Sequence, residues 1–465
     1  MTGPPIWTLA LTSVASFMVV LDSLVVVTAL PAIHRDLGAS LSTLEWTVNG
    51  FTLAFAAGVI TAAALGDRLG RRRVFVLGIS LFTLASAACA MAPTAAALVA
   101  ARAAQGLGAA MVLPLSLTIL AAAFPPERRG TVLGISAGLG GLAVAIGPLV
   151  GGALTQGLDW HWIFWVNVPI GIAAIAASLA RLAESHGPPT RLDLVAAGLV
   201  SAGATAVVWG LIRAGEVGWN NPAAIEALVA GVVLLAGFLA WESRAGEPMI
   251  PLRLFRSRTF SAANATGFLM AGAIFSAAFM VAQYLQFALG YSPLNTGLRM
   301  LPWTATSLVV APLAGVLADR VGARPVLAAG MLLQGVGLAW FATIATIGVG
   351  YGSLVLPLIV AGVGISMALP IAPTAVLSAV APHDVGKGSG VNSTTQRFGS
   401  AFAIALAAAV FAANGHLGTA ASFTAGFRPA LTVIAGLSAL GAVTALAIGP
   451  RRLAVEAAQP DLEAA

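Results

Sequence analysis

The two halves of the sequence share one short motif. It reads Leu65-Gly66-Asp67-Arg68-Leu69-Gly70-Arg71-Arg72 in the first half and Leu317-Ala318-Asp319-Arg320-Val321-Gly322-Ala323-Arg324 in the second. Each copy separates two long apolar runs. Glycine permits a tight turn there, and the aspartate can face the positive amino end of a neighbouring helix. The duplication indicates a chain built from two similar halves of closely packed helices.

The composition defines the class of protein. Of the 465 residues, 59% are hydrophobic and only 9% are charged, and the mean hydropathy is +0.95. A soluble domain of this length carries far more charge. The apolar runs are roughly 20 residues long, which suits α-helices crossing a bilayer and not the alternating strands of a β-barrel. The sequence therefore predicts an all-α polytopic membrane protein.

Polar breaks divide the chain into fourteen apolar runs, and each run is a candidate transmembrane helix. We place these runs at residues 7–30, 43–65, 74–92, 95–123, 131–155, 163–182, 193–214, 222–243, 259–289, 297–318, 326–345, 352–380, 387–412 and 428–449. The motif follows the second and the tenth run, so its copies are eight helices apart. The simplest arrangement is six plus two plus six helices. Its predicted parts are a six-helix bundle at 1–185, two inserted helices at 186–250, a second six-helix bundle at 251–450 and a tail at 451–465.

Basic residues indicate how these helices are oriented. Most of the 23 lysines and arginines fall in loops on the same side as both chain ends, so the positive-inside rule places both termini in the cytoplasm. Because these charges are sorted by loop and do not form one basic surface, we expect no nucleic-acid partner. We expect a monomeric, multi-pass protein of a bacterial cytoplasmic membrane, with the lipid bilayer as its surroundings.

Asp22 is a carboxylate deep inside the first apolar run, where ionisation costs on the order of 3 kcal/mol or more. Every other acidic residue falls in a predicted loop, a tail, or the first or last turn of a run, Glu45 and Glu226 being the deepest of these. Asp22 and Arg102, counted from the nearest predicted helix ends at Leu30 and Ala95, lie at a similar depth. They can form a charge pair, either a proton-coupling site in which Arg102 tunes Asp22 or a permanent structural ion pair.

Several motifs resemble those of a known family. The repeated loop resembles the signature loop of the major facilitator superfamily, in which it acts as a conformational latch. Further stretches resemble the fourteen-helix drug:proton antiporter family: 21–31, 102–110, 147–152, 160–171 and 284–302. The segment 102–110 is similar to one linked to proton transfer, whereas we interpret 160–171 and 284–302 as packing and topology. The resemblance implies the major facilitator fold, with helices 1 and 4 lining a central cavity. The implied latch residues are Asp67, Arg68, Gly70, Arg71, Asp319, Arg320, Gly322 and Arg324.

Small and uncharged polar residues supply the remaining candidates. Gly147, Pro148, Gly151 and Gly152 can form a hinge in the fifth helix, although close packing explains them equally well. Polar side chains in apolar surroundings can shape a substrate cavity, with hydrogen bonds between helices as the alternative for each of them. They are Asn49, Gln105, Gln283, Gln286, Gln334, Asn392 and Gln396. Arg397 is either a gate in the cytoplasmic half or a snorkelling side chain.

These observations favour a proton-coupled antiporter that exports hydrophobic small molecules, such as drugs or antibiotics, by alternating access. Its partners are the substrate and protons. The alternative within transport is an exporter of one natural product or metabolite. A membrane enzyme or a ligand sensor fits less well, because the five histidines have no metal-ligand spacing and no loop is long enough for an output domain. We expect no metal or cofactor, and no nucleotide-binding P-loop is present in the sequence.

Overall fold

The computed structural model describes residues 5–187, 193–246, 248, 250–381 and 384–449. These residues form helices and connecting segments, with no strand among them. The first half of the chain contains α1 (Pro5–Leu37), α2 (Leu41–Leu69), α3 (Arg71–Ala90), α4 (Ala95–Ala123), α5 (Pro126–Gly157), α6 (Trp162–Trp165) and α7 (Asn167–Arg181). Two helices follow, α8 (Leu194–Val217) and α9 (Pro222–Glu242). The predicted tail 451–465 lies outside the described residues.

The second half contains two short helical segments and eight longer or broken helices. They are η1 (Leu252–Arg256), α10 (Arg258–Gln283), η2 (Tyr284–Ala288), α11 (Pro293–Thr304), α12 (Thr306–Val321), α13 (Ala323–Ile344), α14 (Tyr351–Ala368), α15 (Ile371–Leu377), α16 (Val385–Asn414) and α17 (Ala420–Leu446). The pairs α6–α7, α10–η2, α11–α12 and α14–α15 each form one broken span. Fourteen spans of the described chain are then long and apolar enough to cross a membrane, which confirms the predicted number.

Two predicted helix ends are wrong. The first helix does not stop at Leu30 but continues through Pro31 to Leu37, because Ile33 is fully buried and extends the apolar face. The last helix does not begin at Arg428 but at Ala420, with Thr419 capping its amino end. Arg428 lies inside α17 and donates a hydrogen bond from Nε to the carbonyl of Ala342 at 3.1 Å. A charge that finds such an acceptor does not end a helix.

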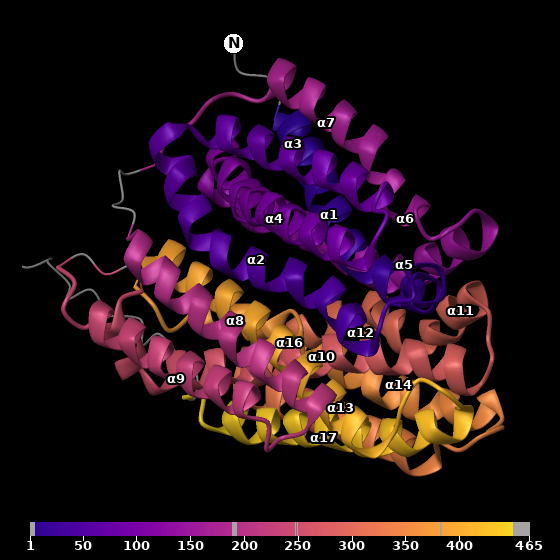
Figure 1. Cartoon of the computed structure of the whole chain (residues 1–465). Helices are drawn as coiled ribbons and strands as arrows, with labels where there is room; N and C mark the ends of the chain where they lie inside the picture. The colour runs from indigo at the N-terminus through magenta and orange to yellow at the C-terminus, as the bar shows by residue number, and fades with distance from the viewer. Residues whose placement is uncertain (1–4, 188–192, 247, 249, 382–383, 450–465) are drawn as a thin grey trace, which may run out of the picture.

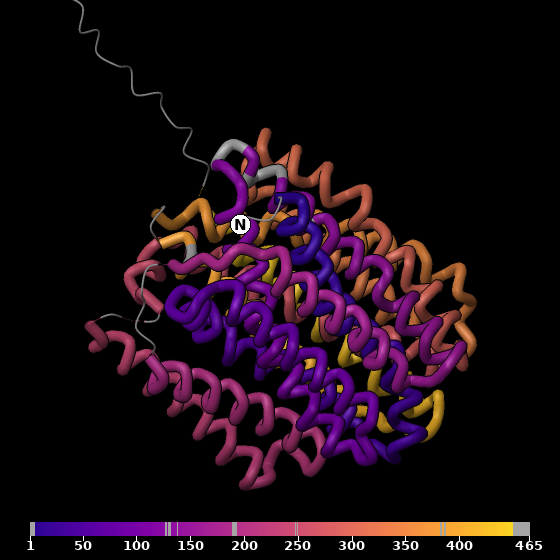
Figure 2. The backbone as a smooth tube through the Cα atoms, turned by 90° about the horizontal axis from the view of Figure 1, so that it is seen from above, coloured from indigo at the N-terminus to yellow at the C-terminus, as the bar shows by residue number. Residues whose placement is uncertain are grey.

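The two halves lie side by side, and the inserted helices lie at their edge. In Figure 1, α1 to α7 form the upper part of the bundle and α10 to α17 the lower part. Figure 2 shows α8 and α9 at one margin of the molecule. These two helices pack on each other, and α8 also contacts α2 of the first half and α16 of the second. The inserted pair thus covers the line where the two halves meet through α2 and α16.

The core is divided differently at the two ends of the bundle. We call the end at which α1 begins and α17 ends the terminal face, and the end at which α1 ends and α17 begins the opposite face. Toward the opposite face one hydrophobic cluster joins both halves, from Val25 and Leu30 of α1 to Met280 of α10 and Phe427 of α17. Toward the terminal face each half has its own cluster. The halves therefore share a large core near the opposite face, and a smaller cluster joins Leu53 of α2 to Ala401 of α16 through α8.

Contacts of α5 follow the same division. Near the opposite face the backbone of α5 touches α11 closely, since a Cβ on Gly152 or Gly297 would collide with backbone atoms of the other helix. Farther along, the hydroxyl of Thr304 donates to the carbonyl of Ala145 at 2.9 Å. Nearer the terminal face, α5 has four glycines at which an added Cβ would meet no neighbouring described atom within 4 Å: Gly134, Gly138, Gly140 and Gly141. The halves part toward the terminal face on this side of the molecule.

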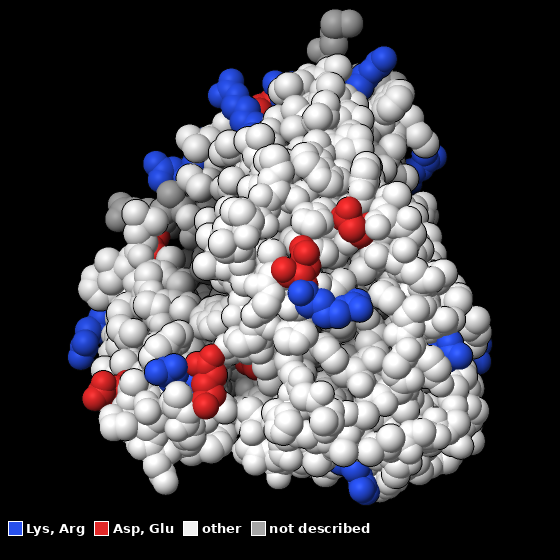
Figure 3. Space-filling model, turned by 45° about the vertical axis from the view of Figure 1, so that its right-hand side comes forward, with Lys and Arg blue, Asp and Glu red and all other residues white. Residues whose placement is uncertain are grey.

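The surface agrees with a membrane location. In the view of Figure 3 most of the visible surface is uncharged, and acidic and basic side chains stand in small, separate groups. Large apolar side chains such as Leu313, Val309 and Val443 are more than 60% exposed. Exposure of this kind in a soluble protein would drive aggregation, whereas lipid tails accept it.

Candidate functional site

Asp22 and Arg102 form a direct ion pair inside the first half. Asp22 lies in the middle of α1 and Arg102 near the start of α4, and both side chains are at most 1% exposed. The Nη1 of Arg102 donates to Oδ2 of Asp22 at 2.5 Å. The pair forms even though α1 extends two turns beyond its predicted end. Comparing the depths of Asp22 and Arg102 in the sequence thus identified the correct pair, although the predicted end of the first helix was wrong.

Two amides complete the coordination of the Asp22 carboxylate. Gln105 lies one turn after Arg102, and its Nε2 donates to Oδ1 of Asp22 at 2.8 Å. Asn167, at the start of α7, donates from Nδ2 to the same oxygen at 2.8 Å. Ser86 of α3 accepts a further bond from Gln105 at 2.7 Å. Gln105, expected in a substrate cavity, therefore lies in a buried network around Asp22, which we call the Asp22 cluster: Asp22, Ser86, Arg102, Gln105 and Asn167.

Arg102 is equally well satisfied. Its Nη1 also donates to Oε1 of Gln105 at 2.6 Å, and its Nε donates to the carbonyl of Thr47 in α2 at 3.1 Å. The guanidinium lies over the ring of Phe51, 4.4 Å from its centroid, and 5.7 Å from that of Phe164. Five helices of one half thus contribute to a single charged network. Such a fully bonded network fixes the positions of its side chains relative to one another.

Sequence reasoning missed two members of this cluster, Ser86 and Asn167. Asn167 belongs to the aromatic stretch 160–171, which we interpreted as packing and topology. The structure breaks the helix there, between α6 and α7, with Val166 between them. The signal for Asn167 was a polar amide inside an apolar run, at a helix break. A break allows such a side chain to turn toward a neighbouring helix.

The remaining polar candidates do not gather in one place. Asn49 and Gln334 are fully buried, and neither side-chain amide has a hydrogen-bond partner. Gln283 donates only to the carbonyl of Phe279 on its own helix, at 3.2 Å. Gln286 donates to the carbonyl of Thr28 at 2.8 Å and so joins the two halves near the opposite face.

Asn392 and Gln396 form a pair one turn apart on α16. The Nε2 of Gln396 donates to Oδ1 of Asn392 at 3.1 Å. The pair faces α10, since a Cβ on Gly267 would lie 3.3 Å from Oδ1 of Asn392. These two side chains therefore lie between helices of the second half.

The repeated motif forms the same turn in both halves. Gly70 and Gly322 connect α2 to α3 and α12 to α13 with positive φ angles of 109° and 91°. Residues with a Cβ rarely adopt these angles, which explains the glycine in both copies. In the first copy Asp67 accepts from Nε of Arg71 at 2.9 Å. Arg68, Arg320 and Arg324 lie in or beside the same turns at the terminal face.

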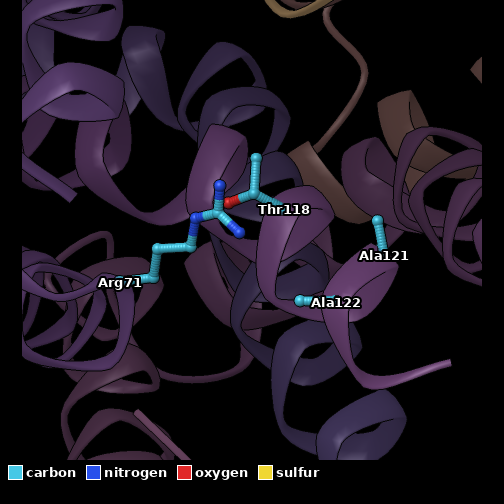
Figure 4. Close-up of a pocket in the computed structure, with 4 residues that line it drawn as sticks. All are labelled: Arg71, Thr118, Ala121 and Ala122. Carbon is cyan, nitrogen blue, oxygen red and sulfur yellow. The ribbon is translucent and has the colours of Figure 1, made fainter. Parts of the chain in front are cut away.

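A recess adjoins the first copy of the motif. Figure 4 shows it between the side chain of Arg71 and the last turns of α4, with the guanidinium directed toward Thr118. Its volume is about 310 Å³ and its other lining residues are Ala121 and Ala122. Arg71 is thus held by Asp67 on one side and faces this recess on the other.

The small residues of α5 are packing positions in this conformation. A Cβ on Gly147 would collide with Leu24, and one on Gly151 with Val25, both of α1. Gly152 meets the backbone of Pro293, and the carbonyl of Pro148 meets Gly297. The helix α5 itself runs without a break from Pro126 to Gly157. These residues let α5 touch helices of both halves at once.

Two further charged residues lie within α2 and α16. Glu45, expected in the first turn of a helix and unremarkable, is only 3% exposed and its Oε2 has no hydrogen-bond partner. It is therefore a second buried acid, four residues inside α2. Arg397 lies in the middle of α16, over the ring of Phe55 at 4.3 Å from its centroid. Among the described residues, no three His, Cys, Asp or Glu side chains lie close enough together to hold a metal ion.

The fold and the buried charge network define a polytopic membrane transporter. Residues 12–300 and 263–464 match the family profile described as the Major Facilitator Superfamily. The chain is 37% identical to the tetracenomycin C resistance and export protein of Streptomyces glaucescens, over 89% of this chain and 77% of that protein. It is 35% identical to the multidrug resistance protein Stp of Mycobacterium tuberculosis, over 87% of this chain and 76% of that protein.

A solved structure supports the fold alone. A crystal structure of the peptide transporter POT superposes with a TM-score of 0.69 at 18% sequence identity, covering 95% of this chain and 93% of that one. Together with the sequence matches, this places the chain in the Major Facilitator Superfamily, among its antibiotic and multidrug efflux transporters. The resemblance inferred from the motifs is confirmed.

Proposed function

We propose that this protein is a proton-coupled antiporter that exports hydrophobic small molecules from the cytoplasm. The observation that carries the proposal is the Asp22 cluster, a buried carboxylate whose three donors come from α4 and α7. An ionisable group at this depth is costly and needs a purpose. The names of the relatives support export of antibiotics and drugs.

The chemistry follows from how Asp22 is held. With Arg102, Gln105 and Asn167 in place, both oxygens of the carboxylate accept hydrogen bonds from the protein. A shift of α1 against α4 and α7 would remove donors, and the carboxylate would then take up a proton. Because α1 also contacts α5 and α10, a rearrangement between the halves reaches Asp22 directly. A proton bound in one conformation and released in the other drives the cycle.

We propose further that the terminal face is cytoplasmic and that the parted halves give the substrate access from that side. The unshared cores and the uncrowded glycines of α5 support this state. Rocking of the halves about the shared core would close this access and open the opposite face. One chain contains both halves, so the transporter works as a monomer.

The test compares two aspartates of the same helix. Asp36 lies at the end of α1 and accepts from Nε1 of Trp160 at 2.8 Å, so Asp36→Asn is a matched control for Asp22→Asn. Both variants are reconstituted in proteoliposomes with an imposed pH gradient and a fluorescent lipophilic drug. Asp22→Asn should abolish uptake driven by the gradient and retain exchange of labelled for unlabelled drug, whereas Asp36→Asn should retain both. Gradient-driven uptake by Asp22→Asn equal to wild type would show that the coupling role is wrong.

A second candidate is export of one natural product. It is favoured by the relative named for tetracenomycin C. A panel of unrelated lipophilic drugs separates the two functions: export of several supports drug efflux, and export of none of them by an active, reconstituted protein supports a dedicated exporter.

A further inference from the structure

Arg397 is a charged residue at the centre of the membrane without a counter-ion. It lies 12 residues from the start of α16 at Val385, about 18 Å along the helix. An arginine side chain cannot bridge that distance to the terminal face, which excludes snorkelling. Among the described residues, Arg397 makes no ion pair and no hydrogen bond to another side chain or carbonyl. Its side chain is partly exposed, so it faces open space.

Aromatic contacts alone do not account for this charge. The guanidinium lies 4.3 Å from the centroid of Phe55 and 6.0 Å from that of Phe275. Cation–π contacts offset only part of the cost of placing an arginine at the bilayer centre. The guanidinium keeps its charge and offers five N–H donors. An anion is the partner that would balance both the charge and the donors.

The described acids do not supply that anion. The helices α10 and α16 contain no aspartate or glutamate, and the acids of α2, Glu45 and Asp67, lie near its two ends. Asp22 lies at a depth in the membrane comparable to that of Arg397, but it already forms an ion pair with Arg102. A bound molecule therefore supplies the anion that neutralises the charge of Arg397.

The surroundings of Arg397 indicate the chemistry of the rest of the molecule that carries this anionic group. Phe55 belongs to α2 in the first half and Phe275 to α10 in the second, so apolar rings of both halves flank the guanidinium. Thr394, one turn earlier on the same face of α16, is buried and its hydroxyl has no partner. These groups suit a molecule with one negative group and a flat apolar body.

We propose that Arg397 binds the carboxylate, or an equivalent single anionic group, of a lipophilic organic acid transported by this protein. The apolar body of the acid lies against Phe55 and Phe275. The same positive charge repels lipophilic cations, so the site discriminates by charge among molecules of one shape. This inference rests on the proposed export function and names the substrate class.

The test uses three probes that share one aromatic body: pyrenebutyrate, its uncharged methyl ester, and pyrenebutyl-trimethylammonium, which carries a positive charge. Equilibrium binding to the purified full chain in detergent is measured for each, without any proton gradient. We expect wild type to bind pyrenebutyrate about tenfold or more tighter than the ester, the range of charged hydrogen bonds, and to bind the cation most weakly. Arg397→Gln should remove the preference for the acid, and Arg397→Lys should retain part of it.

Arg299 offers a matched control. It too lies over aromatic rings, at 3.9 Å from Tyr291 and 5.0 Å from Tyr351, but in α11 near the opposite face. Arg299→Gln should keep the preference for the acid. The inference is overturned if wild type shows no preference for the acid, including no binding of it, or if a folded Arg397→Gln keeps the preference. Because binding is measured at equilibrium, a failure of proton-driven export by wild type would count against the proposed function and leave this result intact.

Discussion

Each half of the molecule places one arginine near the middle of the membrane, and the surroundings of the two arginines differ. In the first half Arg102 is 1% exposed and bonds to Asp22, Gln105 and the carbonyl of Thr47. In the second half Arg397 has two aromatic rings beside it and, in the described chain, no acceptor. Both lie over phenylalanines of α2, Phe51 and Phe55, one turn apart.

The difference separates two kinds of buried charge. A charge with a complete set of protein partners is part of the fold, and it changes state only when the fold rearranges. A charge without partners is ready for a ligand, at a cost in stability until the ligand arrives. We therefore assign coupling to the first half and substrate recognition to the second. The variants below test this division through the stability of the protein.

The largest expected effect concerns the two arginines themselves. Arg102→Gln leaves the Asp22 carboxylate buried without its cation and should reduce stability by about 3–5 kcal/mol. Arg397→Gln removes a charge without a counter-ion and should leave stability unchanged or raise it. Thermal unfolding of the purified proteins in one detergent measures both. An equal loss of stability in the two variants would mean that Arg397 has a structural partner, and the contrast between the halves would disappear.

The sequence predicted more of the first site than of the second. Helix count and the pairing of Asp22 with Arg102 follow from hydropathy and depth, which are properties of single segments. Asn167 was missed because its role depends on a break between α6 and α7 that turns it toward α1. Arg397 could not be assigned because the absence of a partner is a property of all the helices around it. Whether a buried charge has a partner depends on contacts between helices far apart in the sequence. The hydrophobic periodicity of one helix does not contain that information.

A helix end shows the same limit. The sequence predicts that the last helix begins at Arg428, because charges usually mark the ends of apolar runs. The Nε of Arg428 instead reaches the carbonyl of Ala342 in α13, at 3.1 Å, from within α17. Whether a charge ends a helix depends on an acceptor in another helix, which the local sequence does not contain.

An intermediate effect is expected at Asn167. Asn167→Ala removes one of three donors to Asp22, and loss of a hydrogen bond to a buried charged group costs about 1–3 kcal/mol. The matched control is Asn414→Ala at the end of α16, where Nδ2 of an exposed side chain donates to the carbonyl of Val410 at 2.8 Å. That control should change stability by less than about 0.5 kcal/mol. Equal and small effects in both would show that the Asp22 cluster is not a tightly coupled network.

The smallest expected effect concerns Glu45, the buried acid that belongs to neither arginine. Its Oε2 has no partner, and the charge that acts on it is the carboxylate of Glu216 in α8. Glu45→Gln removes an unpaired acid and should raise stability by about 1 kcal/mol, with gradient-driven export retained, because Glu45 is not a member of the Asp22 cluster. Glu226→Gln on the exposed surface of α9 is the control and should change neither quantity. Loss of gradient-driven export in a stable Glu45→Gln would make Glu45 a second coupling acid, and coupling would then not be confined to the Asp22 cluster.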